Sequence, residues 1–184
     1  NDYEKYKAEV VNKLKDYIGR TEGRAFVLFT SYKFMDDVYD ETAPYLHGLG
    51  IPVLKQGAGL PRTKMLETFK RDVGSVIFGV DSFWTGVDVP GEALSNVIIT
   101  RLPFAVPDHP IAEARMEKIK EEGRDPFHEY SLPQAILKLK QGFGRLVRTK
   151  YDTGIVVILD SRILHKPYGR KFLSALPECE IIIE

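Results

Sequence analysis

Apolar residues recur along the chain at two spacings, one typical of helices and one typical of buried strands. The first opens the chain, where apolar residues at steps of three and four predict an amphipathic helix over residues 3–17 that ends at Gly19. The second begins at residues 25–29, an unbroken apolar run that predicts a strand buried on both faces. By the same criteria we expect further strands at residues 53–54, 75–78, 96–100, 155–159 and 181–183, and further helices at residues 31–46, 62–70, 111–122, 133–148 and 169–176.

Strands that alternate with helices predict an α/β fold with a mostly parallel central sheet covered on both faces. We expect one domain over residues 1–184, with a proline-rich loop and a helical insertion at about residues 102–130. In such sheets, ligands bind outside the carboxyl ends of the strands. The segments that follow the predicted strands should therefore carry the chemistry, and these are residues 30–31, 56–57, 81–91, 101–104 and 160–162.

The overall composition adds two limits to this picture. The chain carries 26 basic and 26 acidic side chains, so any nucleic-acid contact must come from local placement and not from bulk charge. The single cysteine, Cys179, cannot form an internal disulfide, which favours a reducing, cytoplasmic setting. No apolar run approaches the roughly 18 residues that a membrane helix needs, and the histidines show no metal-ligand spacing.

The segment QGFGRLVR, which starts at Gln141, carries the strongest chemical pattern. On a helix, Gln141, Arg145 and Arg148 share one face, because their spacing is i, i+4, i+7. Two guanidiniums on one stripe, with no acid between them, favour an incoming anion, and the planar fork of arginine suits phosphate oxygens. Gly142 and Gly144 each cost a helix roughly 1 kcal/mol relative to alanine, which is explained if another backbone or a ligand approaches closely. The alternative is a basic helix end that complements the helix dipole, which explains the arginines but neither the glycines nor the glutamine.

The loop at residues 81–91 (DSFWTGVDVPG) follows a predicted strand directly. Gly86 permits a tight turn whose backbone amides could hold a phosphate, and Asp88 could accept a hydrogen bond from a ribose or from an arginine across a cleft. The alternative is a purely structural loop. We favour that alternative for Phe83 and Trp84, which we expect to pack in the core, and a functional role for Asp88.

Thr30 and Ser31 place two hydroxyls between a predicted strand and the start of a helix. Hydroxyls and free backbone amides at a helix start suit a phosphate. The simpler interpretation is that Ser31 caps the helix. Both roles can hold together, because a cap and a phosphate use the same helix end.

The sequence contains no phosphate loop of the form G-x-x-x-x-G-K-[ST]. It also lacks an adjacent acidic pair after a strand that could hold magnesium, because Asp36 and Asp37 fall within a predicted helix, where we expect a solvated face. A stripe of arginines without a phosphate cradle implies that the cradle belongs to another domain or chain.

Three segments occur in a defined order along the chain: FTS at residues 29–31, VDSFWTGVDVPG at residues 80–91 and QGFGRLVR at residues 141–148. They resemble motifs IV, V and VI of superfamily 2 helicases, in the version of the DinG/XPD group. The LPF run at residues 102–104 and the LDSR run at residues 159–162 are also similar to DinG-like proteins. The resemblance spans about residues 24–177, nearly the whole chain.

The resemblance implies the second, C-terminal lobe of a DNA helicase motor. Such a lobe is a RecA-like three-layer α/β/α domain of the P-loop NTPase fold, here without its own phosphate loop. ATP with Mg²⁺ would be held mainly by an N-terminal RecA-like lobe. Arg148 and Arg145 would be arginine fingers on the γ-phosphate, and Gln141 would position them or the attacking water. By itself the chain is therefore expected to be inactive as an ATPase.

Motifs IV and V extend the implied site. Gly86 and Asp88 would contact the nucleotide and couple its state to DNA. The contacts to single-stranded DNA would come from four hydroxyl-bearing residues: Thr30, Ser31, Ser82 and Thr85. Related members often have Glu where Thr85 stands, so Thr85 is given no catalytic role. The iron–sulfur cysteines of some members lie in the first lobe.

Two other functions are open at this stage. One is a stand-alone module that binds nucleic acid or a protein without ATPase activity. The other, a flavodoxin-like small-molecule domain, is disfavoured by the QGFGRLVR segment. Because the chain starts with Asn and not Met, we expect it to be part of a longer protein.

Overall fold

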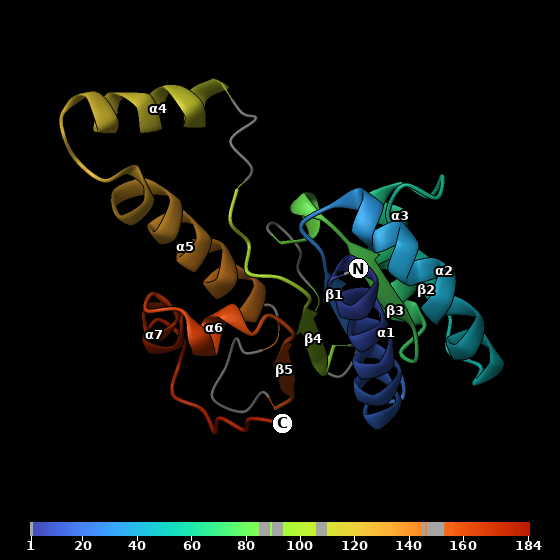
Figure 1. The fold of residues 1–184 in the computed structure, drawn as a ribbon. Helices are drawn as coiled ribbons and strands as arrows, with labels where there is room; N and C mark the ends of the chain where they lie inside the picture. The colour runs from blue at the N-terminus through green and yellow to red at the C-terminus, as the bar shows by residue number, and fades with distance from the viewer. Residues whose placement is uncertain (1, 85–88, 90–93, 106–109, 145, 147–152) are drawn as a thin grey trace. The chain divides into compact units, whose positions relative to one another are not determined.

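The computed structural model describes residues 2–84, 89, 94–105, 110–144, 146 and 153–184. The chain forms two compact units (Figure 1). The sheet unit comprises residues 1–101 and 141–160, and the helical unit comprises residues 102–140 and 161–184. The expectation of one domain with an insertion at about residues 102–130 stays a prediction.

The sheet unit alternates strands and helices, as the apolar pattern predicts. Its elements are α1 (Asp2–Arg20), β1 (Ala25–Leu28), α2 (Tyr32–Gly48), β2 (Val53–Lys55), α3 (Arg62–Arg71), β3 (Val76–Gly79), a 3₁₀ turn (Asp81–Phe83), β4 (Asn96–Ile99) and β5 (Ile155–Ile158), together with the last residues of α5 (Leu132–Phe143). The predicted fold class is confirmed.

All pairings among the described strands are parallel, in the order β2-β3-β1-β4-β5. β1 is the central strand, and its Leu28 lies opposite Gly79 of β3 and Ile99 of β4. The residues of β1, β3 and β4 are all buried, which is why these strands are apolar apart from Asn96 at the start of β4. Since the strands are parallel and in register, their carboxyl ends share one edge of the sheet.

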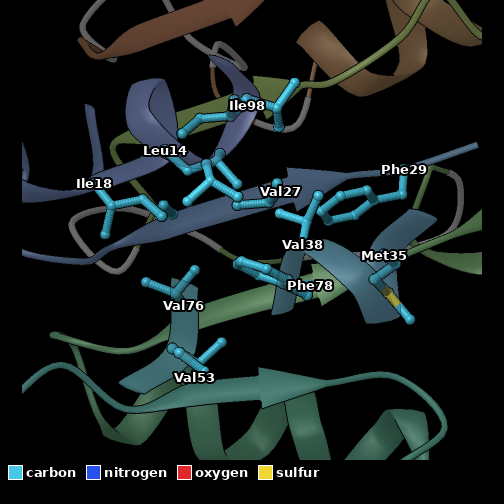
Figure 2. Packing of buried hydrophobic residues seen from close by; sticks show 14 of the residues in the cluster. Leu14, Ile18, Val27, Phe29, Met35, Val38, Val53, Val76, Phe78 and Ile98 are labelled. Atoms are coloured by element: carbon cyan, nitrogen blue, oxygen red, sulfur yellow. The ribbon is translucent and has the colours of Figure 1, made fainter. Parts of the chain in front are cut away.

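One face of the sheet packs against α1 and α2. Alternate strand residues, such as Val27 and Phe29 on β1 and its extension, point toward Leu14 of α1 and Val38 of α2 (Figure 2). All four side chains belong to one buried cluster. The apolar stripe of α1, predicted from its spacing of three and four, is the surface that meets the sheet.

The opposite face of the sheet is covered by α3 and by the end of α5. The Phe69 ring of α3 lies 4.9 Å from the ring of Phe26 on β1. On the same face, a side chain at Gly142 of α5 would come within 3.3 Å of Leu28. Helices therefore cover both faces of the sheet, which is the expected three-layer arrangement.

The helical unit is built from α4 (Pro110–Glu121), a π-helical turn (Phe127–Ser131), most of α5, α6 (Arg162–His165) and α7 (Gly169–Ser174). Its aromatic centre is formed by four rings: Phe104, Phe127, Tyr168 and Phe172. Phe104 lies 5.8 Å from Phe127 and 5.7 Å from Phe172, measured between ring centroids. The LPF run thus contributes its phenylalanine to the packing of this unit.

Two expectations drawn from the sequence are wrong. Helix α5 ends at Phe143 and does not continue unbroken through the predicted range 133–148, because Gly144, a poor helix former, and Leu146 lie in turns. Residues 145, 147 and 148 of that range lie outside the described residues. Residues 181–183 form no strand: their isoleucines are 58% to 72% exposed, and no described strand pairs with them.

Among the described residues, no helix combines the length and the apolar character needed to cross a membrane.

Gly79 at the end of β3 is expected to tolerate no side chain. A Cβ atom there would lie 2.6 Å from Cγ of the fully buried Phe83. Gly79→Ala should therefore destabilise the chain by about 1–3 kcal/mol. Gly19→Ala is the matched control, because it fills open space in α1 and gains helix propensity. Urea unfolding should show opposite shifts for the two variants, and equal midpoints would contradict the packing described.

Candidate functional site

The carboxyl edge of the sheet gathers the polar residues that the sequence places after its strands. Backbone bonds extend the ladders past the strand ends: the Phe29 N–H donates to the Gly79 carbonyl at 2.8 Å, and the Thr100 N–H donates to the Leu28 carbonyl at 3.1 Å. Thr30 and Ser31 therefore follow the central strand, with the end of β3 on one side and the end of β4 on the other.

Gln56, directly after β2, joins three of these segments through its side-chain amide. Its Oε1 accepts from the Val80 N–H at 2.8 Å, and its Nε2 donates to the Tyr32 hydroxyl at 2.8 Å and to Ser82 Oγ at 3.2 Å. The amide thus positions Ser82, which the sequence predicts as a DNA contact. The sequence indicates residues 56–57 only as a strand end, because the partners of the Gln56 amide are brought close only by the pairing of β2 with β3.

Ser31 caps α2, as predicted. Its Oγ accepts a hydrogen bond from the Phe34 N–H at 3.3 Å. Thr30 is half-buried and Ser31 is exposed, so both lie at the surface of the carboxyl edge. Their contact with a phosphate stays a prediction.

The aromatic pair of the loop after β3 is structural, as we favour from the sequence. Phe83 and Trp84 are fully buried. The Trp84 indole N–H donates to the Phe29 carbonyl at 2.9 Å, which ties the loop to the central strand. A Cβ at Gly142 would lie 3.2 Å from the Trp84 ring. Close approach therefore explains Gly142, but the approaching group is a side chain and not a ligand or a backbone.

Of the remaining predicted site residues, the structure describes only Gln141, which is half-buried in the last turn of α5. Five others lie outside the described residues: Thr85, Gly86, Asp88, Arg145 and Arg148. Their roles stay predictions.

The acidic pair in α2 is partly exposed to solvent, and each of its carboxylates also has a partner. Asp36 accepts a hydrogen bond from the Lys55 ammonium at 2.7 Å, and this bond raises the pKa of Lys55. Asp37 accepts from the Tyr3 hydroxyl, and this bond raises the pKa of that phenol. The cation at the end of β2 is therefore already neutralised by a carboxylate.

Within the described part of the chain, no group of three or more His, Cys, Asp or Glu side chains is placed to hold a metal ion. The groups that the described edge offers to a ligand are hydroxyls, an amide and an arginine.

Comparison with known families identifies the family of the chain. The family model described as "Helicase C-terminal domain" matches residues 14–179. The chain belongs to the helicase C-terminal domain family. The resemblance drawn from the FTS, VDSFWTGVDVPG and QGFGRLVR segments is thereby confirmed.

Curated relatives of this helicase C-terminal domain carry DinG and YoaA names. It is 43% identical over 160 residues to the ATP-dependent DNA helicase YoaA of Haemophilus influenzae, covering 87% of this chain and 24% of that protein. It is 38% identical over 184 residues to the ATP-dependent DNA helicase DinG of Photobacterium profundum, covering 98% and 26%. It is 42% identical over 159 residues to the 3'-5' exonuclease DinG of Bacillus subtilis, covering 86% and 17%. The chain thus spans about a quarter or less of the length of these relatives.

Solved structures support the fold. A structure of an XPD helicase superimposes with a TM-score of 0.66 at 19% identity, covering 90% of this chain and 30% of that one. The S. tokodaii Xpd4 structure gives a TM-score of 0.57 at 19% identity, covering 91% and 33%. At this level of identity the likeness shows that the helicase C-terminal domain has a RecA-like fold, and no more.

Removal of the Gln56 amide should destabilise the chain. In Gln56→Ala the N–H of the buried Val80 has no acceptor, so we expect the free energy of unfolding to fall by about 1–3 kcal/mol. Gln134→Ala, an exposed glutamine in α5, should change stability by no more than about 0.5 kcal/mol. Calorimetric melting of both variants measures the difference, and equal melting temperatures would count against the bridging role.

Proposed function

We propose that this chain is the second motor lobe of an ATP-dependent DNA helicase and that it works within a longer protein. The observation that carries the proposal is the family match over residues 14–179, joined to a sheet edge where Thr30, Ser31 and Ser82 are exposed or half-buried. Parallel sheets bind ligands at this edge. The exonuclease activity named for the B. subtilis relative is not transferred, because the chain matches only 17% of that protein.

Single-stranded DNA is the proposed substrate of the carboxyl edge. Thr30, Ser31, Ser82 and Thr85 would contact its sugar–phosphate backbone. In the described part of this set, the Gln56 amide and the α2 cap hold the hydroxyls of Ser82 and Ser31 in place. Hydroxyl contacts to phosphate carry no base information, so this part of the binding should be independent of sequence.

ATP with Mg²⁺ is the proposed cofactor, held mainly by an N-terminal RecA-like lobe. When bound, it supplies the phosphoryl group whose transfer to water drives the motor. The described residues fit a shared site, since they include Gln141 at the end of α5. From this chain, Arg148 and Arg145 would place guanidiniums on the γ-phosphate, and Gln141 would orient them or the attacking water. Gly86 and Asp88 would contact the nucleotide from the loop after β3.

The packing of Trp84 supports a link between the two sets of residues. Trp84 belongs to the motif V loop and is hydrogen-bonded to the Phe29 carbonyl. Its ring lies against Gly142, in the motif VI segment that also contains Gln141. One side chain therefore touches the strand that leads to Thr30 and the helix that leads to the arginines. This arrangement suits a lobe in which nucleotide state and DNA contact are coupled.

ATP hydrolysis by the full-length protein tests the motor assignment. We expect DNA-stimulated hydrolysis by the full-length protein and none by the 184-residue chain alone. Full-length Arg148→Lys and Arg148→Ala should both lose turnover by roughly a thousandfold or more, because a point ammonium cannot replace the guanidinium fork. Arg71→Lys, an exposed arginine at the end of α3, is the matched control and should keep normal turnover.

Three outcomes would contradict these expectations. Near-normal turnover of Arg148→Lys would remove Arg148 from the mechanism. DNA-stimulated hydrolysis by the isolated chain would show that it is more than half a motor, whereas DNA binding without any hydrolysis by the full-length protein would favour a stand-alone binding module.

Thr30→Val in the full-length protein tests the DNA contact. The substitution keeps the shape of the side chain and removes the hydroxyl, so affinity for single-stranded DNA should fall by roughly tenfold at every salt concentration. Thr63→Val, an exposed threonine in α3, should leave affinity unchanged. Ser31→Asn retains a side chain that can cap α2, so it tests the contact of the Ser31 hydroxyl with DNA without removing the helix cap. Fluorescence anisotropy with a labelled oligonucleotide gives the affinities, and equal values for Thr30→Val and wild type would exclude the contact.

A further inference from the structure

Arg101 presents an exposed guanidinium at the carboxyl end of β4, directly after Thr100. Its Cζ lies 4.5 Å from the centroid of the Tyr6 ring and 5.3 Å from that of the Phe34 ring. In the part of the chain that the structure describes, no carboxylate forms an ion pair with it. Stacking on an aromatic ring at an exposed site contributes only about 0.5–1 kcal/mol, and it leaves the N–H donors at the edge of the guanidinium available.

The two rings beneath Arg101 are themselves held in place. The Tyr6 hydroxyl donates to the Thr100 carbonyl and lies 3.5 Å from the Leu159 carbonyl, so α1 is tied to the ends of β4 and β5. The Tyr6 and Phe34 rings are stacked, with centroids 5.4 Å apart and planes 19° from parallel. Phe34 is 5% exposed. Because its platform is rigid, the Arg101 side chain loses less conformational freedom when it binds a ligand.

Arg101 and Thr30 follow neighbouring strands of the sheet. Leu28 of β1 pairs with Ile99 of β4, and the Thr100 N–H donates to the Leu28 carbonyl at 3.1 Å, so Thr30 and Arg101 each come two residues after the last pair, at the same edge of the sheet. Lys55 at the end of β2 differs, because its ammonium is paired with Asp36 at 2.7 Å. Of these two strand-end cations, Arg101 is the one left for an external anion.

We propose that Arg101, laid on the Tyr6 and Phe34 rings, binds a backbone phosphate of the single-stranded DNA that passes Thr30. The inference rests on the proposed function and adds a charged contact that none of the three helicase-like motifs contains. The planar fork of arginine accepts two phosphate oxygens at once. Arg101 thereby supplies sequence-independent, salt-sensitive affinity in a chain whose formal net charge is zero.

The test is the salt dependence of single-strand binding by the full-length protein. Affinity for an oligothymidine and for a mixed-sequence oligonucleotide of equal length is measured between about 50 and about 200 mM salt. Arg101→Gln should lower affinity for both by roughly tenfold at low salt. It should also reduce the slope of log affinity against log salt by about 0.7, the value for one phosphate contact on a single strand. Arg101→Lys should keep the slope and recover part of the affinity.

Arg71→Gln is the matched control. It removes the same charge from an exposed arginine at the end of α3, which leads to the amino end of β3 and so to the opposite edge of the sheet. Its affinity and slope should equal those of the wild type. The KM for ATP at saturating DNA should be the same in Arg101→Gln and wild type, since the phosphate belongs to DNA and not to the nucleotide.

Each other outcome overturns the inference. An unchanged slope in a folded Arg101→Gln protein, with or without weaker binding, shows a structural side chain only. A raised KM for ATP with an unchanged slope assigns Arg101 to the nucleotide. In both cases the wild type still binds DNA, and the proposed function stands. Absence of salt-dependent DNA binding by the wild type removes the proposed function and the inference together.

Discussion

The backbone hydrogen bonds of β1 to its two neighbours are the constraint on which the rest of the sheet unit depends. Leu28 is opposite Gly79 on one side and Ile99 on the other, so three chain segments leave the sheet at the same level. A slip by one residue would turn Phe26 and Leu28 toward α1 and α2 and would separate the polar residues that follow. The core on the two faces therefore enforces the arrangement at the edge.

Side chains complete the backbone hydrogen bonding where the parallel ladders end. The Gln56 amide accepts from the Val80 N–H, the Trp84 indole donates to the Phe29 carbonyl, and the Tyr6 hydroxyl donates to the Thr100 carbonyl. Backbone groups at strand ends need partners wherever they are buried. Here each partner also fixes the position of a segment that reaches the surface. The same hydrogen bonds therefore satisfy buried backbone groups and position the residues of the candidate site.

The periodic elements were predictable because buried strands and amphipathic helices leave apolar patterns that need no tertiary information. The Ser31 cap and the burial of Trp84 followed from local chemistry in the same way. Contacts between distant segments left no such trace: nothing in residues 56–57 indicates that the Gln56 amide meets Ser82, and nothing near Tyr6 indicates Arg101. The end of α5 at Phe143 and the exposed isoleucines at residues 181–183 were mispredicted, because propensity alone does not tell whether a helix continues or a strand finds a partner.

Trp84 also has a spectroscopic consequence. It is the one tryptophan among the 184 residues, and it lies fully buried against Gly142 while its indole N–H is bonded to the Phe29 carbonyl. Indole emission responds to the polarity around the ring and to hydrogen bonding of its N–H. The domain therefore contains an intrinsic fluorophore at the contact between the loop after β3 and the end of α5, and changes at that contact can be followed optically without any attached dye.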